Sequence, residues 1–244
     1  MFAGPNGSGK STVIASLLKS ELKPDWLGVY VNADDIEKVL RETHSLSLAP
    51  FKVAISPSAW KSFLEVSTLL QTKNQHLSGI ERITVDESGF HAVDVAINSY
   101  HASVIADFLR HKLLEHRISF TFETVMSHPG KIAFLKQAQA ENYRTYLYYI
   151  ATEDPGINIQ RVAARVLSGG HDVPDRKVVE RYHRSLSLLK DAILASNRSY
   201  IFDNSRQDFS WIAEVTNGTT LDFKSEYTPG WLIDALGDLL ITEN

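Results

Sequence analysis

The chain has 244 residues, is 43% hydrophobic and carries a formal net charge of −4, so it can bury one sizeable core and shows no basic excess that points to nucleic acid. The absence of cysteine excludes disulfides, a cysteine nucleophile and thiolate metal sites. No apolar run reaches the roughly 18 residues of a membrane span, and the N-terminus lacks a signal-peptide pattern, so we expect a soluble, cytoplasmic protein without a membrane partner.

The first half of the chain opens with a strand, a glycine-rich loop and a helix. Apolar runs alternate with amphipathic stretches, which is typical of an α/β fold with a parallel sheet and flanking helices. The stretch at about 45–100 is longer than a connection usually needs, so we expect an inserted substrate lobe within one domain over 1–244. The expected elements here are a strand at 1–3, a helix at 11–22, a strand at 27–32, a helix at 59–70 and a short strand at 83–85.

The second half repeats strands and helices around an arginine-rich segment. We expect about five parallel strands in all, with the segment at about 155–185 forming a lid. The remaining expected elements are a helix at 90–116, a strand at 118–122, a helix at 131–142, a strand at 145–151, a helix at 187–196, a strand at 200–202 and a helix at 231–240.

A complete phosphate-binding motif follows the first strand. The sequence satisfies the pattern GxxxxGK[ST], in which glycines let backbone N–H groups face phosphate oxygens and the next helix adds its N-terminal dipole. Lys10 is expected to reach the β- and γ-phosphates, and the hydroxyl of Ser11 to ligate Mg²⁺. The motif predicts binding of ATP or GTP by Gly4, Pro5, Asn6, Gly7, Ser8, Gly9, Lys10, Ser11 and Thr12.

Acidic side chains follow two of the predicted strands. Asp34 and Asp35 come just after the second strand, and Glu123, next to Thr124, ends the strand at 118–122. Ligands of open α/β sheets bind at this edge, so Asp34 is a candidate general base for a substrate hydroxyl and Glu123 a candidate for binding substrate or a Mg²⁺-bound water. The alternative is structural: Asp34 or Asp35 caps the helix near Ile36, and Glu123 is a cap or a surface acid.

The lid segment carries candidate arginines for phosphoryl transfer. Arg161 and Arg165 are one helical turn apart and share a face, and acids are sparse around them. Arginine supplies the positive charge that the transferred phosphoryl group needs. The alternative is a solvated helical face.

Four segments together resemble a known family. They are FAGPNGSGKST at 2–12, NADDI at 32–36, SFTFETVMS at 119–127 and the run from RVAARVLSGGHDVP onward at 161, with IFDNS at 201–205 also fitting. In this order they resemble the zeta toxin family of P-loop kinases, in particular the branch labelled "predicted ABC-type ATPase". The resemblance covers most of the chain except the insert and the tail.

The resemblance implies an ATP-dependent kinase that phosphorylates a hydroxyl of UDP-N-acetylglucosamine and is blocked by a small antitoxin. It implies Asp34 as catalytic base, Lys10 and Ser11 as the P-loop pair, Arg161 as the first γ-phosphate arginine and Glu123 as a substrate-binding acid. Thr124 and Asp35 join it as candidate substrate-binding residues. The second family arginine falls near His171, a further substrate-site candidate, and Arg165 or Arg176 is left to compensate.

Three other interpretations stay open. A P-loop kinase acting on another metabolite, such as a nucleoside or a sugar, would use the same residues with a different acceptor. An ABC-type ATPase is disfavoured because Pro174 interrupts the signature helix and the last strand ends in Asp203 and Asn204. A non-catalytic nucleotide-binding module is the third, and measurable phosphoryl transfer would exclude it.

Overall fold

The computed structural model describes residues 1–19, 24–67, 69–70, 76–167 and 172–237. The chain divides into two compact units. The first unit comprises Met1–Lys23 and Glu123–Asn244, and the second comprises Pro24–Phe122.

The sheet of the first unit is parallel at its centre and ends in an antiparallel hairpin. Strand β1 pairs on one side with the last two residues of β6 and on the other with β7, so that Phe2 stands opposite both Glu123 and Tyr148. Strand β7 pairs with β8 in parallel, and β9 and β10 then extend the sheet in antiparallel fashion. The strands are β1 (Phe2–Ala3), β6 (Phe120–Thr124), β7 (Tyr146–Ala151), β8 (Arg198–Asp203), β9 (Ser210–Thr216) and β10 (Thr220–Phe223).

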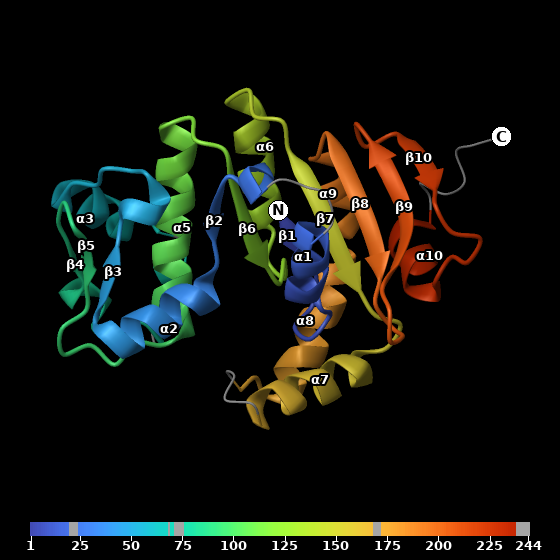
Figure 1. Cartoon of the computed structure of the whole chain (residues 1–244), viewed down its shortest axis with the longest axis horizontal. Coiled ribbons are helices and arrows are strands. Elements are labelled where there is room, and N and C mark those ends of the chain that lie inside the picture. The colour runs from blue at the N-terminus through green and yellow to red at the C-terminus, as the bar shows by residue number, and fades with distance from the viewer. Residues whose placement is uncertain (20–23, 68, 71–75, 168–171, 238–244) are drawn as a thin grey trace. The chain divides into compact units, whose positions relative to one another are not determined.

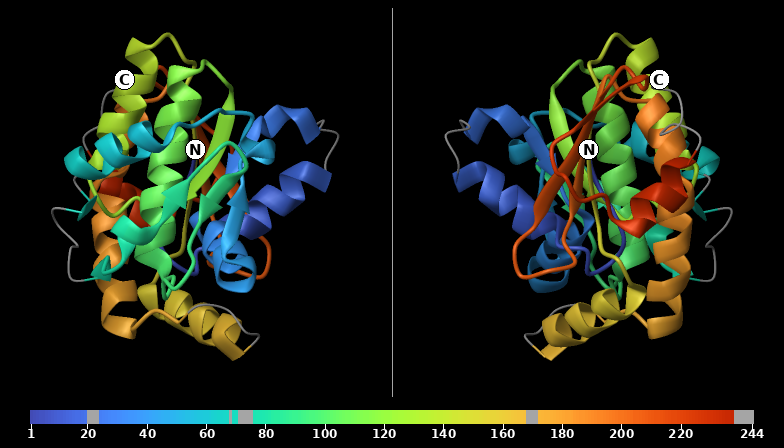
Figure 2. Two further views of the ribbon diagram at one scale, coloured as in Figure 1. Left: turned by 90° about the vertical axis from the view of Figure 1, so that its left-hand side faces the viewer. Right: turned by 90° about the vertical axis from the view of Figure 1, so that its right-hand side faces the viewer.

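Helices cover both faces of this sheet. Helix α1 lies on one face, and α6, α8, α9 and α10 lie on the other (Figure 2). Helix α7 lies beyond the ends at which β7 and β8 terminate (Figure 1). Within the described residues, no helix combines the length and apolarity needed to cross a bilayer. The helices are α1 (Lys10–Lys19), α6 (Gly130–Ala140), α7 (Pro155–Leu167), α8 (Asp175–Ser187), α9 (Leu189–Leu194) and α10 (Gly230–Leu236).

The second unit packs helices and a small sheet around an aromatic core. Strand β2 pairs in parallel with the first residues of β6, and β5 pairs antiparallel with both β3 and β4. Trp60 is buried against Phe90 and Phe108, and its indole N–H donates to the carbonyl of Ile83 over 2.8 Å. The elements are η1 (Pro24–Leu27), β2 (Val29–Val31), α2 (Ala33–Thr43), β3 (Ser45–Ser47), η2 (Ala49–Phe51), α3 (Pro57–Val66), η4 (Ile80–Arg82), β4 (Thr84–Val85), β5 (Gly89–His91) and α5 (Ser99–Glu115).

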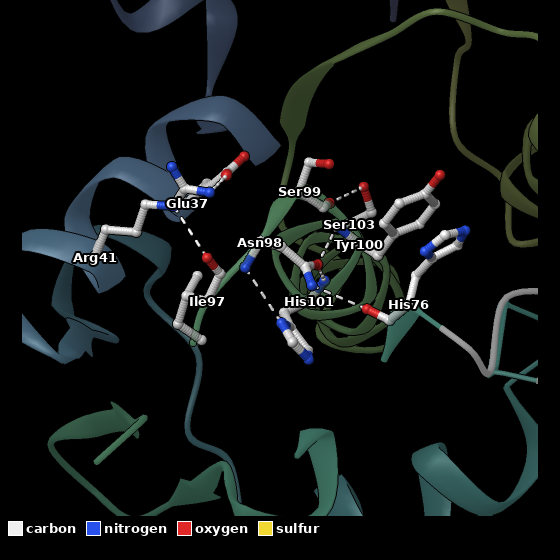
Figure 3. Close-up of polar contacts among 9 residues, drawn as sticks. All are labelled: Glu37, Arg41, His76, Ile97, Asn98, Ser99, Tyr100, His101 and Ser103. Atoms are coloured by element: carbon white, nitrogen blue, oxygen red, sulfur yellow. Dashed lines mark hydrogen bonds and ion pairs between the residues drawn. The ribbon is translucent and has the colours of Figure 1, made fainter. Parts of the chain in front are cut away.

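The start of α5 is fixed by a capping box with an unusual partner. The side chain of Asn98 accepts from the N–H groups of Tyr100 and His101, and Nδ1 of His101 accepts from the N–H of Asn98 over 3.2 Å (Figure 3). The other ring nitrogen of His101 lies 3.2 Å from the carbonyl of Ser78. The imidazole is 1% exposed. It therefore carries its proton on Nε2, and its unprotonated Nδ1 acts as the acceptor.

This arrangement makes the stability of the second unit depend on pH. Burial lowers the pKa of His101, with the carbonyls of Ser78 and Leu77 and the charge of Glu81 opposing it. The unfolded chain therefore takes up the proton first, and stability is expected to fall as pH decreases below the ordinary histidine range of about 6.5. Glutamine at this position keeps the capping box and does not titrate. The free energy of unfolding of wild type and His101→Gln can be measured by denaturation at pH 7.5 and 5.0. It is expected to fall more between these two pH values in wild type than in the variant. Equal falls would contradict this role of His101.

The architecture confirms the expected α/β fold and corrects two of its elements. The helix expected at 90–116 begins only at Ser99, because Phe90 belongs to β5 and the capping box at Asn98 starts the helix. The five parallel strands expected are present as β2, β6, β1, β7 and β8, but the sheet also extends past the expected last strand into the antiparallel β9 and β10, which were not expected.

Candidate functional site

The phosphate-binding loop joins β1 to α1 in the first unit. Gly7 and Gly9 have φ of +73° and +91°, a conformation that favours glycine. Lys10 begins α1, and its ammonium donates to the carbonyl oxygens of Gly4 over 2.9 Å and Pro5 over 3.0 Å. The lysine thus lies back across its own loop, where an anion of higher charge density than a carbonyl can compete for it.

Ser11 and Glu123 lie next to each other at this loop. Strand pairing of β1 with β6 sets Glu123 beside Phe2, directly before the loop. The hydroxyl of Ser11 donates to the Glu123 carboxylate, with distances of 3.2 and 3.4 Å to its two oxygens. The neighbouring Thr124 accepts from the N–H of Met126 over 3.1 Å and so shapes the turn after β6. A hydroxyl beside a carboxylate is a pair of hard oxygen donors of the kind that Mg²⁺ prefers.

Arg161 lies on α7 and points to the loop after β8. Its two terminal nitrogens donate to the carbonyls of Asn204 over 2.8 Å and Arg206 over 3.3 Å. Arg165, predicted to share its role, is exposed in the last turn of the same helix. Arg161 therefore contacts the loop that follows β8.

Arg181 contacts the phosphate-binding loop and was not among the candidates chosen from the sequence. It lies on the half-buried side of α8, and its Nη1 is 3.4 Å from the side-chain oxygen of Asn6 in the phosphate-binding loop. The next residue, Tyr182, is buried and donates to the carbonyl of Thr152 over 2.6 Å. This anchor holds the helix so that the guanidinium of Arg181 is directed to the loop. Burial and nearby carboxylates raise the pKa of Tyr182, so it remains a neutral donor.

Two asparagines also hold the loop and were likewise not selected from the sequence. Asn158 of α7 donates to the carbonyl of Asn6 over 2.5 Å, and Asn204 after β8 donates to the carbonyl of Ser8 over 2.8 Å. Both side chains are buried. The loop is therefore fixed by residues about 150 and 200 positions along the chain from it.

Asp34 and Asp35 lie in the second unit, in the first turn of α2. The helix begins at Ala33, and its cap is Asn32, whose side chain accepts from the N–H of Asp34 over 2.8 Å. Neither aspartate is the N-cap, so the structural alternative considered for them does not hold. Both are exposed. The pKa of Asp35 is raised by partial burial and by the charge of Asp34, with Lys38 opposing the rise.

The remaining candidate, His171, lies outside the described residues. In the first unit the structure thus brings together the loop with Lys10, the Ser11–Glu123 pair, and arginines from α7 and α8. A loop of this form can bind phosphate groups through its N–H groups and Lys10, while the hydroxyl and carboxylate offer oxygen ligands to a divalent cation.

Sequence comparisons link part of the chain to known proteins. Residues 91–206 match the family model described as Zeta toxin, a segment that includes Glu123 and Arg161 but not the phosphate-binding loop. A 74-residue stretch, 30% of this chain, is 34% identical to an uncharacterised protein of Haemophilus influenzae. This match spans 53% of that protein, or about half its length.

Structural comparison finds similar solved structures at low sequence identity. A crystal structure of AvrRxo1-ORF1:-ORF2 with ATP superposes over 100% of this chain with a TM-score of 0.53 and 14% identity. The toxin–antitoxin system PezAT of Streptococcus pneumoniae covers 98% of this chain and 82% of its own, with a TM-score of 0.47 and 13% identity. The chain spans 65% of the AvrRxo1 structure's chain. The family match over residues 91–206 makes this part of the chain, just under half of its length, similar to the zeta toxin family.

Proposed function

We propose that this protein is a kinase that transfers the γ-phosphoryl group of ATP to a hydroxyl of a small molecule. The observation that carries the proposal is the constellation of Lys10, Ser11 and Glu123 at one phosphate-binding loop. Lys10 would leave the carbonyls of Gly4 and Pro5 for the β- and γ-phosphates, because a charged acceptor binds an ammonium more strongly than a neutral one.

The donor set at this loop fits a magnesium ion. Ser11 and Glu123 present a hydroxyl and a carboxylate within 3.2 Å of each other, and Mg²⁺ binds through one or two such groups together with phosphates and water. When bound, Mg²⁺ neutralises charge that develops on the phosphate oxygens. The residues proposed to hold it are the hydroxyl of Ser11 directly and the carboxylate of Glu123 directly or through water.

Asp34 is the proposed general base for the acceptor hydroxyl. Its carboxylate is exposed in the first turn of α2 and is not the N-cap of that helix, which favours a role in accepting a proton. The family resemblance points to a sugar nucleotide such as UDP-N-acetylglucosamine as acceptor, with Asp35, Thr124 and His171 as further substrate-binding residues. The same resemblance, and the two-protein AvrRxo1-ORF1:-ORF2 complex, support a small antitoxin as partner. The proposed place of the reaction is the cytoplasm, as a source of ATP.

Arginines of the lid segment are proposed to bind the γ-phosphate. Arg161 is the first, with Arg165 as an alternative on the same helix. The family's second arginine falls at His171 in this sequence, and the contact of Arg181 with Asn6 supports Arg181 as its replacement.

Replacing Arg181 with alanine is expected to weaken ATP binding by about 10-fold or more and to leave ADP binding nearly unchanged, because only ATP carries the γ-phosphate. Titration calorimetry of both nucleotides measures this difference. Arg184→Ala is the matched control, since Arg184 is exposed one turn further along α8 and pairs with Glu180. An unchanged ratio of ATP to ADP affinity in Arg181→Ala would contradict the assignment.

The acceptor is tested by incubating the protein with MgATP and UDP-N-acetylglucosamine and measuring the product mass. A gain of one phosphate on UDP-N-acetylglucosamine is expected. If the acceptor is instead a nucleoside or a simple sugar, a screen of those compounds will show the phosphorylated product. ATP binding without transfer to any acceptor would favour the non-catalytic module and overturn the proposal.

A further inference from the structure

The carbonyl groups of the phosphate-binding loop are almost all occupied by donors. Those of Gly4 and Pro5 accept from the Lys10 ammonium, and that of Gly9 accepts from the N–H of Val13 within α1. Two carbonyls between them, at Asn6 and Ser8, accept from side chains elsewhere in the first unit. The carbonyl oxygens of the loop are therefore directed into the protein, where donors from other elements fix two of them.

Asn158 holds the first of these carbonyls. It is fully buried in the first turns of α7, and its Nδ2 donates to the oxygen of Asn6 over 2.5 Å. Its own side-chain oxygen accepts from the hydroxyl of Thr152, which fixes the orientation of the amide. With the oxygen occupied in this way, the amide can present only its N–H groups to the loop.

Asn204 holds the second. It is 7% exposed, and its Nδ2 donates to the oxygen of Ser8 over 2.8 Å. The backbone of Asn204 is itself fixed, because its N–H donates to Ala151 over 2.8 Å and its carbonyl accepts from Arg161 over 2.8 Å. The proposed γ-phosphate arginine is thus bonded to a residue that also holds the loop.

The direction of a carbonyl decides the direction of the next N–H. In a trans peptide the C=O and N–H groups point to opposite sides, so fixing the carbonyls of Asn6 and Ser8 turns the N–H groups of Gly7 and Gly9 away from the two asparagines. A side chain on Gly7 would bring its Cβ within 2.5 Å of the main-chain oxygen of Asn158. The glycines therefore permit the close approach of the residues that orient them.

We propose that Asn158 and Asn204 are positioning residues, which orient the N–H groups of Gly7 and Gly9 toward the nucleotide phosphates before the nucleotide binds. This inference rests on the proposed nucleotide binding at the loop. Preorganised N–H groups need no rearrangement when the anion arrives, which favours affinity for the phosphates that ATP and ADP share. Because Asn158 and Arg161 lie on the same turns of α7, the helix that carries the lid arginine also sets the loop.

The test uses aspartate variants, which keep the shape of the side chain and exchange its donor for an acceptor. At pH 8, Asn158→Asp and Asn204→Asp are each expected to lose about 10-fold or more in affinity for ATP, ADP and pyrophosphate alike. Toward pH 5 the loss relative to wild type should shrink, since a protonated carboxyl can again donate to the carbonyl.

Asn197→Asp is the matched control. The side-chain oxygen of Asn197 accepts from the N–H of Thr145 over 2.8 Å, so a carboxylate replaces it without losing an acceptor, and nucleotide affinity should not change. Asn158→Ala and Asn204→Ala remove the donor without adding a charge and should show smaller losses of affinity than the aspartate variants. Folded variants that bind nucleotides like wild type at pH 8 would overturn the inference, even if their melting temperature falls. A wild-type protein that binds no nucleotide would overturn the proposed function instead.

Discussion

Replacing Lys10 with alanine is expected to abolish phosphoryl transfer and to weaken ATP binding by about 100-fold. The estimate follows from the loss of charge-assisted hydrogen bonds worth about 1.5–3 kcal/mol each, at about 1.4 kcal/mol per factor of ten. In the structure the ammonium bonds two carbonyls of its own loop, at Gly4 and Pro5. Its removal thus costs the loop two internal contacts as well as the contacts proposed with the β- and γ-phosphates.

The measurement is a titration of wild type and Lys10→Ala with ATP, followed by a transfer assay. Lys19→Ala is the control, because Lys19 is an exposed lysine in the last turn of the same helix. To separate loop collapse from lost phosphate contacts, Lys10→Met keeps the aliphatic stem without the charge. Wild-type ATP affinity in both Lys10 variants would contradict binding at this loop.

The loop could be predicted from sequence because its requirements are local. Glycines, lysine and serine at fixed spacing define the backbone path of the loop and the first turn of α1. In the structure, Gly7 and Gly9 have positive φ and Lys10 begins α1. The position of Glu123 beside Ser11 could also be predicted. Glu123 ends an apolar strand, and parallel strands present the residues at their carboxyl ends at one edge of a sheet.

The hairpin β9–β10 could have been predicted and was not. Residues 213–216 and 220–223 alternate apolar and polar side chains on either side of Asn217 and Gly218, both of which have positive φ. Asn-Gly between alternating segments is the strongest short-range signal for a hairpin. The sequence analysis predicted only a helix at 231–240 in this tail and did not use the Asn-Gly signal that precedes it.

The residues that hold the loop could not be predicted in this way. Asn158, Arg181 and Asn204 lie far from the loop in sequence, and each is one polar residue among many in its segment. Their role follows from tertiary contacts between α7, α8, the end of β8 and the loop. Spacing and composition do not encode those contacts. The two asparagines are identified by buried amides that donate to main-chain carbonyls, and Arg181 by its contact with the side chain of Asn6.

Replacing Asp34 with asparagine is expected to lower the turnover number about 1,000-fold while ATP binds as in wild type, because a general base acts on the acceptor and not on the nucleotide. The substitution is mild for the fold. Helix α2 is capped by Asn32, which bonds the main-chain N–H of residue 34 and not its carboxylate. Glu42→Gln, at an exposed position on the same helix, is the control for loss of one negative charge.

The same experiment distinguishes Asp34 from the neighbouring Asp35 as the general base. The charge of Asp34 is one cause of the raised pKa of Asp35, so its removal should lower the pKa of Asp35 and leave that carboxylate more fully ionised. If Asp35 were the base, Asp34→Asn would therefore retain transfer, and Asp35→Asn would lose it. If Asp34 is the base, a more ionised neighbour does not restore turnover, because a general base must lie within hydrogen-bond reach of the proton it removes. Turnover in Asp34→Asn close to that of Glu42→Gln would contradict Asp34 as the base.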